Sequence, residues 1–160
     1  ITFPELHFDH YSQYVTSRNI SEVIHENNVV LLCVDNHKTR KLISDYCSQL
    51  NNIILLSGGN DYTDGNVQIY VREGGVDKTP NLTDYHPEIA EPDDKSPDEM
   101  SCEELAKSDP QLFFANVGVA TFMCWAFYNV VINKEIDISG MYFDLVKMSA
   151  VAAQRKPLTT

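Results

Sequence analysis

The first half of the chain contains two short, nearly continuous apolar runs separated by an amphipathic stretch. Residues 28–34 and 53–56 are rich in Val, Ile and Leu, which is typical of strands covered on both faces of a sheet. Between them, apolar side chains recur at helical spacing from residue 36 to about residue 50, and Asn36 is a preferred residue for a helix start. We therefore predict two parallel strands joined by a helix, whose inward positions are Leu42, Ile43, Tyr46, Cys47 and Leu50.

Weaker patterns precede this unit. Residues 6–15 begin with alternating apolar and polar positions and predict an early strand followed by a polar loop. Residues 21–26 predict a short helix that Ser17 or Ser21 caps, because a hydroxyl oxygen can accept a hydrogen bond from the first helical turn.

A third strand follows the two apolar runs, and its pattern differs from theirs. The Ser57-Gly58-Gly59 run predicts the end of the second parallel strand, and Asp64-Gly65 is a turn signal. Residues 66–72 then alternate between apolar and polar positions, which predicts a strand with one exposed face. The apolar positions are Val67, Ile69 and Val71.

The second half is divided by a segment rich in Gly, Pro and acidic residues. Residues 73–98 predict a long irregular crossing, and such loops in compact domains are usually functional or mobile. The remaining elements are a short helix at 101–107, a long helix at 110–134 with Pro110 in its first turn, closing strands at 141–146 and 149–153, and a tail at 155–160. Polar residues interrupt the apolar run 112–132, so we predict a buried helix rather than a membrane span.

Composition and charge limit the class of protein. With 160 residues, of which 43% are hydrophobic, the chain is long enough for one domain with its own core. A net charge of -11 argues against binding nucleic acid or an anionic membrane surface, since both require clustered Lys and Arg. Many of the acids lie within residues 84–104, which predicts a solvated acidic loop or a docking surface for a basic partner.

The four cysteines indicate a reducing compartment. They form no C-x-x-C pair and no regular spacing, which fits neither a disulfide framework nor a zinc site, so we predict a cytoplasmic protein without zinc. Cys33 and Cys124 lie in apolar runs and are predicted core residues, as is Cys47. Cys102 is different: Ser101 and Glu104 form a capping box around it, and a helix start favours the thiolate form.

Polar residues at the end of the first apolar run are the leading candidates for a site. In an open α/β sheet, ligands bind at the carboxyl ends of the strands, where Asp35 and Asn36 are predicted to lie. The alternative is that this pair only caps the following helix, and the two roles are compatible. Arg40, one turn later, is placed to bind Asp35 or an anionic ligand, or to form a structural ion pair.

The order of these motifs resembles the E1-like adenylating enzymes, the superfamily of the ThiF, MoeB and HesA proteins. The matching pieces are Val-Asp-Asn-x-x-x-Arg after a buried strand, Ser-Gly-Gly before a turn, Asp-Gly-Asn-Val-Gln-Ile, and Met-Ser-Cys-Glu-Glu before a long helix containing Val-Gly-Val. The family's glycine-rich phosphate loop is absent, since the chain contains no G-x-G-x-x-G or G-x-x-x-x-G-K-[ST] motif. The resemblance therefore implies the C-terminal part of an adenylation domain at residues 1–154, with a crossover loop at 73–100. It also implies a Rossmann-like α/β fold with a mixed sheet, incomplete at its N-terminal side.

The resemblance further implies a reaction and a set of ligands. The intact protein is expected to adenylate the C-terminal glycine of a ubiquitin-like or sulfur-carrier protein, with ATP contacted by Asp35, Asn36 and Arg40. Asp35 would hold Mg²⁺ through the nucleotide. Cys102 would then accept the activated acyl group as a thioester or persulfide, although a cysteine without a catalytic role in the loop is an equal alternative.

Two other interpretations remain at this point. The chain can be a catalytically silent dimerisation or docking subunit of the same superfamily, which the missing phosphate loop favours. It can also belong to a nicotinamide-dependent Rossmann enzyme. By resemblance to the family, we expect a homodimer.

Overall fold

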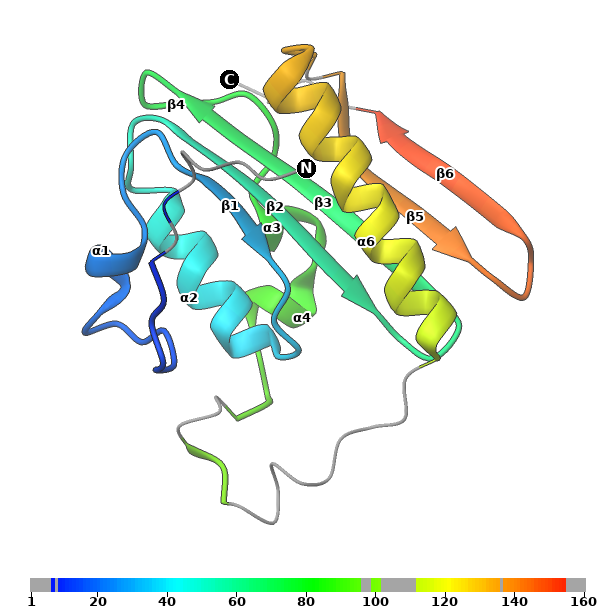
Figure 1. The fold of residues 1–160 in the computed structure, drawn as a ribbon, viewed down its shortest axis with the longest axis horizontal. Coiled ribbons are helices and arrows are strands. Elements are labelled where there is room, and N and C mark those ends of the chain that lie inside the picture. Colours follow the sequence, from blue (N-terminus) through cyan, green and yellow to red (C-terminus); the bar gives the residue numbers. More distant parts are fainter. Residues whose placement is uncertain (1–6, 8, 96–98, 102–111, 136, 155–160) are drawn as a thin grey trace.

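An open mixed sheet forms the centre of the molecule (Figure 1). The computed structural model describes residues 7, 9–95, 99–101, 112–135 and 137–154. Within them the strand order is β1-β2-β3-β5-β6, and β1 (Val29–Leu32) runs parallel to β2 (Ile53–Asn60). The antiparallel strands are β3 (Asp64–Glu73), β5 (Ile138–Asp144), β6 (Ser149–Gln154) and the short β4 (Val76–Asp77), which pairs with β3. The predicted α/β fold, with parallel strands first and antiparallel closing strands later, is confirmed.

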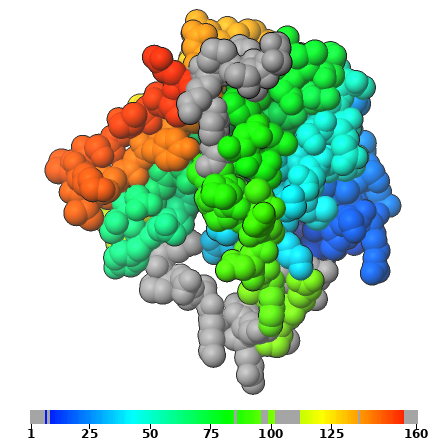
Figure 2. Space-filling view, turned by 180° about the vertical axis from the view of Figure 1, so that it is seen from behind, coloured from blue at the N-terminus to red at the C-terminus, as the bar shows by residue number. Residues whose placement is uncertain are grey.

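Helices cover both faces of this sheet. One face packs against α1 (Ile20–Val23), α2 (His37–Cys47), α3 (Leu82–Tyr85) and α4 (Pro87–Ala90), and the core on that side includes Leu55 and Tyr70. The other face packs against α6 (Phe113–Phe127), which crosses β2 and β3 and continues as the π-helix η2 (Tyr128–Ile132). Seen from behind, residues 82–90 lie between α2 and the β5–β6 hairpin (Figure 2).

The first helix of the parallel unit forms as its sequence predicts. Asn36 is the N-cap of α2, and its side-chain oxygen accepts a hydrogen bond of 2.7 Å from the backbone N–H of Thr39. Ile43 and Cys47 are fully enclosed, and the other predicted inward residues pack at the margin of the same core. Both the helix and its capping residue are therefore confirmed.

The glycines after the second apolar run do not end the strand. β2 continues through Gly58 and Gly59 to Asn60, and Gly65 pairs with Asn60 inside the hairpin instead of forming its turn. The reason is close packing: a Cβ atom on Gly58 would clash with Met123 Sδ, and one on Gly65 would lie 2.8 Å from the Phe143 ring. Glycine allows α6 and Phe143 to approach the sheet here, so the sequence prediction of a strand end and turn was wrong.

The predicted exposed face of the third strand is also wrong. Val67, Ile69 and Val71 are buried as expected, but Gln68 and Tyr70 on the opposite face are 7% and 0% exposed. Helices of the crossing cover that face, since Tyr70 belongs to the same core as residues of α3 and α4. The polar residues between the apolar ones therefore point into the molecule rather than into water.

The crossing is more ordered than its composition predicts. It contains β4, α3 and α4, and the buried Thr79 ties it to β3 by accepting from Val71 N and donating to the Ile69 carbonyl. Residues 102–107 of the predicted helix 101–107 lie outside the described residues, as does Pro110. At the N-terminal side, residues 9–15 form no strand, and α1 begins after Asn19 without a side-chain cap from Ser17 or Ser21.

The long apolar helix is buried on one side only. Val119, Met123 and Ala126 pack against the sheet, whereas Phe113 and Trp125 on the outside are 70% and 55% exposed. Sequence analysis predicted a buried helix, which holds only for the inner side. By length and composition alone, Phe113–Ile132 is the stretch among the described residues that could cross a membrane, although its inner side belongs to the domain core.

Candidate functional site

A cavity of about 380 Å³ opens where the two parallel strands end. Asp35 and Asn36 follow β1, Gly59 and Asn60 end β2, and Arg40 comes from the first turn of α2; all of them line this cavity. The volume lies within the range of ligand-binding pockets, and the carboxyl edge of parallel strands is where open α/β sheets bind ligands. The structure therefore brings all three residues predicted at this edge, Asp35, Asn36 and Arg40, to one cavity.

Asp35 and Asn36 occupy different positions within the site. The Asp35 side chain is exposed and lines both the main cavity and a neighbouring one of about 280 Å³ against α6. The Asn36 side chain is used as the cap of α2, as described above. The capping role that sequence analysis weighed for this pair is thus filled by Asn36, which leaves the Asp35 carboxylate facing the cavities.

Arg40 is part of the cavity wall and is itself almost enclosed. It is 8% exposed, and its guanidinium donates to Ser57 Oγ at 2.7 Å, to the Val34 carbonyl at 2.5 Å and to the Gly58 carbonyl at 2.7 Å. Burial lowers the pKa of this guanidinium, and the nearby Asp35 carboxylate acts in the opposite direction. Arg40 therefore links the ends of β1 and β2 by hydrogen bonds rather than by a single ion pair.

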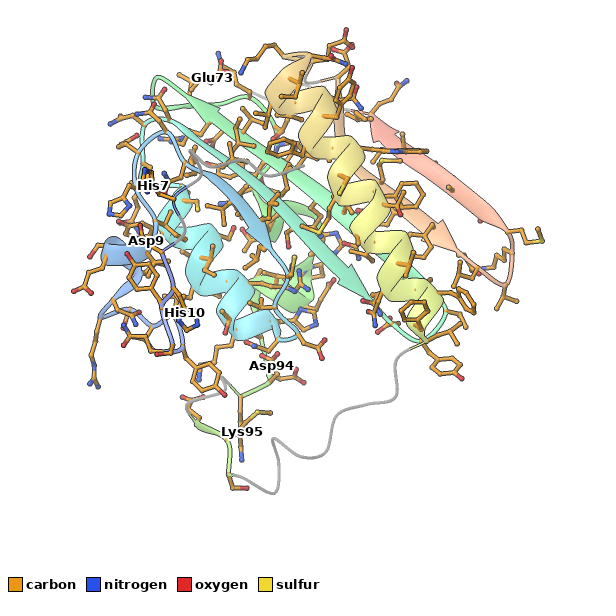
Figure 3. All side chains as sticks on the ribbon, viewed as in Figure 1. His7, Asp9, His10, Glu73, Asp94 and Lys95 are labelled. Atoms are coloured by element: carbon orange, nitrogen blue, oxygen red, sulfur yellow. The ribbon has the colours of Figure 1, made fainter. Side chains whose placement is uncertain are left out.

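The crossing closes one side of the cavity and is tied to the start of α2. Asp94 accepts hydrogen bonds from the backbone N–H groups of His37, at 2.5 Å, and Lys38, at 3.0 Å. Figure 3 shows Asp94 at this end of the helix. A carboxylate is favourable at a helix N-terminus because it pairs with free N–H groups and with the positive end of the helix dipole. Lys38 adds an ion pair to Glu99.

Comparison with known proteins identifies the family. The sequence model of the ThiF family matches residues 2–155. The chain belongs to the ThiF family. This membership places it in the E1-like superfamily that also contains the MoeB and HesA proteins. No curated protein matches the chain.

Enzymes of the ThiF family generally use ATP and Mg²⁺. Among the described residues, no group of three or more His, Cys, Asp and Glu side chains is placed to hold a metal ion by itself. Proteins commonly bind Mg²⁺ through one or two carboxylates and the phosphates of a substrate. The cavity fits such a nucleotide-borne ion, which Asp35 or another exposed lining carboxylate would hold, better than it fits a resident metal.

The charge of the cavity makes a bridging cation important. Its wall carries five carboxylates, from Asp35, Asp61, Asp64, Glu88 and Asp94, while Arg40 supplies the one guanidinium among the described lining residues. The Arg40 hydrogen bonds described above use three of the five N–H donors of that guanidinium. A polyphosphate would meet like charge here unless divalent cations or donors from other polypeptide neutralised it.

The prediction of a core position is confirmed for Cys47 and wrong for Cys33 and Cys124. Cys47 is buried, and burial raises its pKa to about 12, which makes it an inert core thiol. Cys33 and Cys124 are exposed rather than buried, so their assignment to the core was wrong. Cys33 sits just beyond the end of β1, and Cys124 lies on the outer side of α6, away from the sheet. Cys102, the predicted acyl acceptor, lies outside the described residues.

Two site residues were missed by sequence analysis. Gln68 was assigned to an exposed face, and His86 was treated as a loop histidine without a partner. In the structure both line the main cavity. Gln68 is flanked by Val67 and Ile69 in a buried strand, and this position of a polar residue is the signal that could have marked it as a site residue. His86 had no comparable signal, because Tyr142, which lies 3.2 Å from its Nε2, is 56 positions away in the sequence and is brought to it only by the fold.

Proposed function

We propose that this ThiF-family chain forms the acceptor-binding part of an enzyme that adenylates the C-terminal glycine of a ubiquitin-like or sulfur-carrier protein. The observation that carries the proposal is the cavity of about 380 Å³ at the carboxyl ends of β1 and β2, lined by Asp35, Asn36 and Arg40. Asp35 would hold Mg²⁺ on ATP. The ion would stabilise the charge that develops on the phosphates as the carboxylate attacks.

The phosphate-binding loop would come from polypeptide outside these 160 residues. The chain contains no glycine-rich phosphate motif. In addition, β1 pairs only with β2 among the described strands. Leu31 of β1 is 53% exposed, and it lies on the same face of the sheet on which α6 packs against β2 and β3. Parallel strands are normally flanked and covered on both faces, so β1 offers an edge for a further strand and its helix.

The direct test is carrier-dependent exchange of pyrophosphate into ATP by the chain together with the polypeptide that supplies the loop. Asp35→Asn removes the metal-binding charge and is expected to abolish exchange. Asp45→Asn is the matched control, because Asp45 lies on α2, does not line the cavity and forms a surface ion pair with Lys41. Exchange that persists in Asp35→Asn would contradict the role of this carboxylate.

Transfer after adenylation is assigned to Cys102. A thiolate at that position would attack the carbonyl of the acyl adenylate, form a thioester and release AMP. Cys102→Ala is expected to leave exchange intact and to remove only the covalent enzyme-carrier adduct, which a non-reducing gel detects. Loss of exchange in a folded Cys102→Ala protein would show that this division between the two steps is wrong.

A catalytically silent subunit of the same superfamily is the second candidate. Two observations favour this second candidate. The carboxylates of the cavity repel the phosphates of a nucleotide, and the chain contains no glycine-rich phosphate motif that would bind them. This candidate predicts no exchange with any carrier and retained binding of a partner subunit. In either case we propose a homodimer, with the exposed outer side of α6 as its contact.

A further inference from the structure

Two buried polar atoms have no hydrogen-bond partner among the described residues, and both belong to side chains that line the main cavity. They are Gln68 Oε1 and His37 Nδ1. The side chain of Gln68 is 7% exposed and lies on the face of β3 that the crossing covers. Its carbonyl oxygen can only accept, and the imidazole nitrogen accepts in one of its two neutral tautomers. A buried acceptor without a donor is destabilising, so these atoms indicate a ligand that brings hydrogen-bond donors.

The wall of the main cavity determines the chemistry of that ligand. Its five carboxylates face one guanidinium among the described lining residues, so a cation is favoured and an anion is opposed. Ile89 is the single apolar side chain in this part of the wall. An organic cation with a hydrocarbon chain would cover polar groups of the wall with methylene groups and take them out of water, whereas a hydrated ion would not. The wall therefore favours a small cation that keeps its water.

The carboxylates are spread around the wall rather than gathered at one point. Among the described residues, no three His, Cys, Asp or Glu side chains converge to coordinate a metal ion directly. Mg²⁺ gives up its water reluctantly and usually keeps several water ligands. Since each of these waters donates hydrogen bonds, the acceptors of a hydrated ion lie about 5 Å from the metal instead of about 2 Å. A cavity with separated acceptors, one of them buried and unpartnered, fits such an ion.

Strand β3 supplies a row of acceptors with suitable spacing. Asp64, Asn66 and Gln68 all line the main cavity, and alternate residues of a strand face the same side of a sheet. Neighbouring members of the row are about 7 Å apart along the strand, so an ion above Asn66 has all three side chains within reach of its waters. The row runs from the exposed Asp64 through the half-buried Asn66 to the buried Gln68. A hydrated ion can therefore enter from solvent.

Arg40 is the one guanidinium among the described lining residues, and its charge is largely offset by other carboxylates. Burial lowers the pKa of Arg40, and the charges of Asp35 and Asp94 act against that shift. Two of the remaining carboxylates, Asp61 and Asp64, lie at the turn between β2 and β3, next to the row of acceptors. The β3 side of the cavity therefore keeps a negative charge that Arg40 does not neutralise.

We propose that the main cavity binds one hydrated divalent cation along β3, held through its waters by Asp64, Asn66 and Gln68 and without direct coordination by the protein. This ion is separate from the nucleotide-borne ion at Asp35, and its binding requires neither ATP nor a carrier. It donates a hydrogen bond to the buried Gln68 carbonyl through a water ligand and reduces the repulsion among the carboxylates. The chain therefore holds a cation before any nucleotide arrives.

Calorimetric titration of the chain with Mg²⁺, in the absence of ATP, tests the proposal. About 0.15 M NaCl screens the diffuse attraction of cations to the surface, and we expect one saturable site under these conditions. The second probe is hexaamminecobalt(III), which has the octahedral shape and the donors of hydrated Mg²⁺ but does not release its ammonia ligands. It is expected to displace Mg²⁺ from the site. Failure to displace Mg²⁺, or the absence of a saturable site, would overturn the proposal.

Substitutions on β3 locate the ion. Gln68→Leu removes an acceptor and Asp64→Asn removes a charge, and each is expected to weaken binding of both probes about fivefold. Gln49→Leu and Asp45→Asn are the matched controls, because neither residue lines the cavity, and both variants should bind as the unmodified protein does. Equal affinities of Gln68→Leu and Gln49→Leu would contradict the site. If Gln68→Leu does not fold, the comparison of Asp64→Asn with Asp45→Asn decides, because Asp64 is exposed.

Asp35→Asn separates this site from the nucleotide site. It is expected to change the affinity for hexaamminecobalt(III) by less than about twofold, because Asp35 follows β1 and is not part of the row on β3. If Asp35→Asn loses the ion while Asp64→Asn keeps it, the ion belongs to the nucleotide site and the proposal is wrong. Ion binding that depends on Gln68, with no exchange by any carrier, would refute adenylation and retain this site. Carrier-dependent exchange without ion binding in the absence of ATP would do the reverse.

Discussion

Arg40 links the site to the stability of the sheet. Its three hydrogen bonds reach Ser57 and the Val34 and Gly58 carbonyls, so removing the guanidinium leaves three buried acceptors with fewer donors. We expect Arg40→Met to lower the free energy of unfolding by about 2–4 kcal/mol. Urea denaturation measures the change.

The same substitution at a surface arginine is the control for that experiment. Arg18 is exposed near α1, and Arg18→Met is expected to change stability by less than about 0.5 kcal/mol. If both variants unfold at the same urea concentration, the three hydrogen bonds contribute little. The role of Arg40 would then be confined to ligand binding.

The thiols differ in their predicted reactivity. At about pH 8, a thiol with the pKa of Cys47 is ionised to about one part in ten thousand, and burial also blocks access. We expect iodoacetamide to modify the exposed Cys33 and Cys124 in the native protein and to spare Cys47 until denaturant is added. Peptide mass spectrometry identifies the modified positions. Rapid labelling of Cys47 in the native state would show that the core opens readily.

At the scale of elements, the crossing and α2 act as one unit through Asp94. We expect Asp94→Ala to cost about 1 kcal/mol, a typical value for losing a helix cap. It should also speed hydrogen exchange at the backbone amides of His37 and Lys38. Asp93→Ala provides the control, because Asp93 is the neighbouring exposed aspartate and the structure shows no capping contact from it. Equal exchange rates in both variants would contradict the capping role.

The outer side of α6 is the predicted contact between copies of the chain. An exposed apolar stripe along a whole helix is unusual for a monomer. It consists of Phe113, Phe114, Val117, Trp125, Tyr128 and Ile132. We expect the double substitution Trp125→Glu and Tyr128→Glu to convert a dimer into a monomer in sedimentation experiments. A protein that is monomeric before substitution would contradict the proposed homodimer.

For the molecule as a whole, the negative charge opposes the binding of a nucleotide. The net charge of -11 and the carboxylates of the main cavity oppose a polyphosphate. We expect calorimetry to show weak or no ATP binding by the chain alone, and an increase when Mg²⁺ is added. Tight binding without Mg²⁺ would contradict this reasoning and would imply phosphate contacts beyond those described.

Much of the fold could be predicted because local patterns and tertiary packing agree in it. The parallel unit around α2 has apolar periodicity, a capping residue and a strand on each side, and all three indicate the same structure. Predictions failed where a glycine serves close packing rather than a turn, as at Gly58 and Gly65. They also failed where a crossing covers a strand face that its alternating pattern had marked as exposed, as at Gln68.

The site was predicted in part for the same reason. Asp35, Asn36 and Arg40 follow one another along the chain at the end of a recognisable strand, so one local pattern places all of them. His86 and Tyr142 are 56 positions apart and meet only through the crossing and the hairpin. No local pattern contains such a pair, and sequence analysis therefore could not find this contact at the edge of the main cavity.

The three hydrogen bonds of Arg40 also bear on how variants of this protein should be compared. In a variant library that is scored only by cell growth or by product formed, substitutions at residue 40 would rank with those at Asp35, since both would abolish the measured activity. The causes would differ. A substitution at residue 40 destabilises the folded sheet, whereas a substitution at residue 35 removes a charge from a stably folded protein. Measuring soluble yield together with growth or product would separate the two kinds of defect. A defect at residue 40 should become smaller when the temperature is lowered, whereas one at residue 35 should persist in the cold.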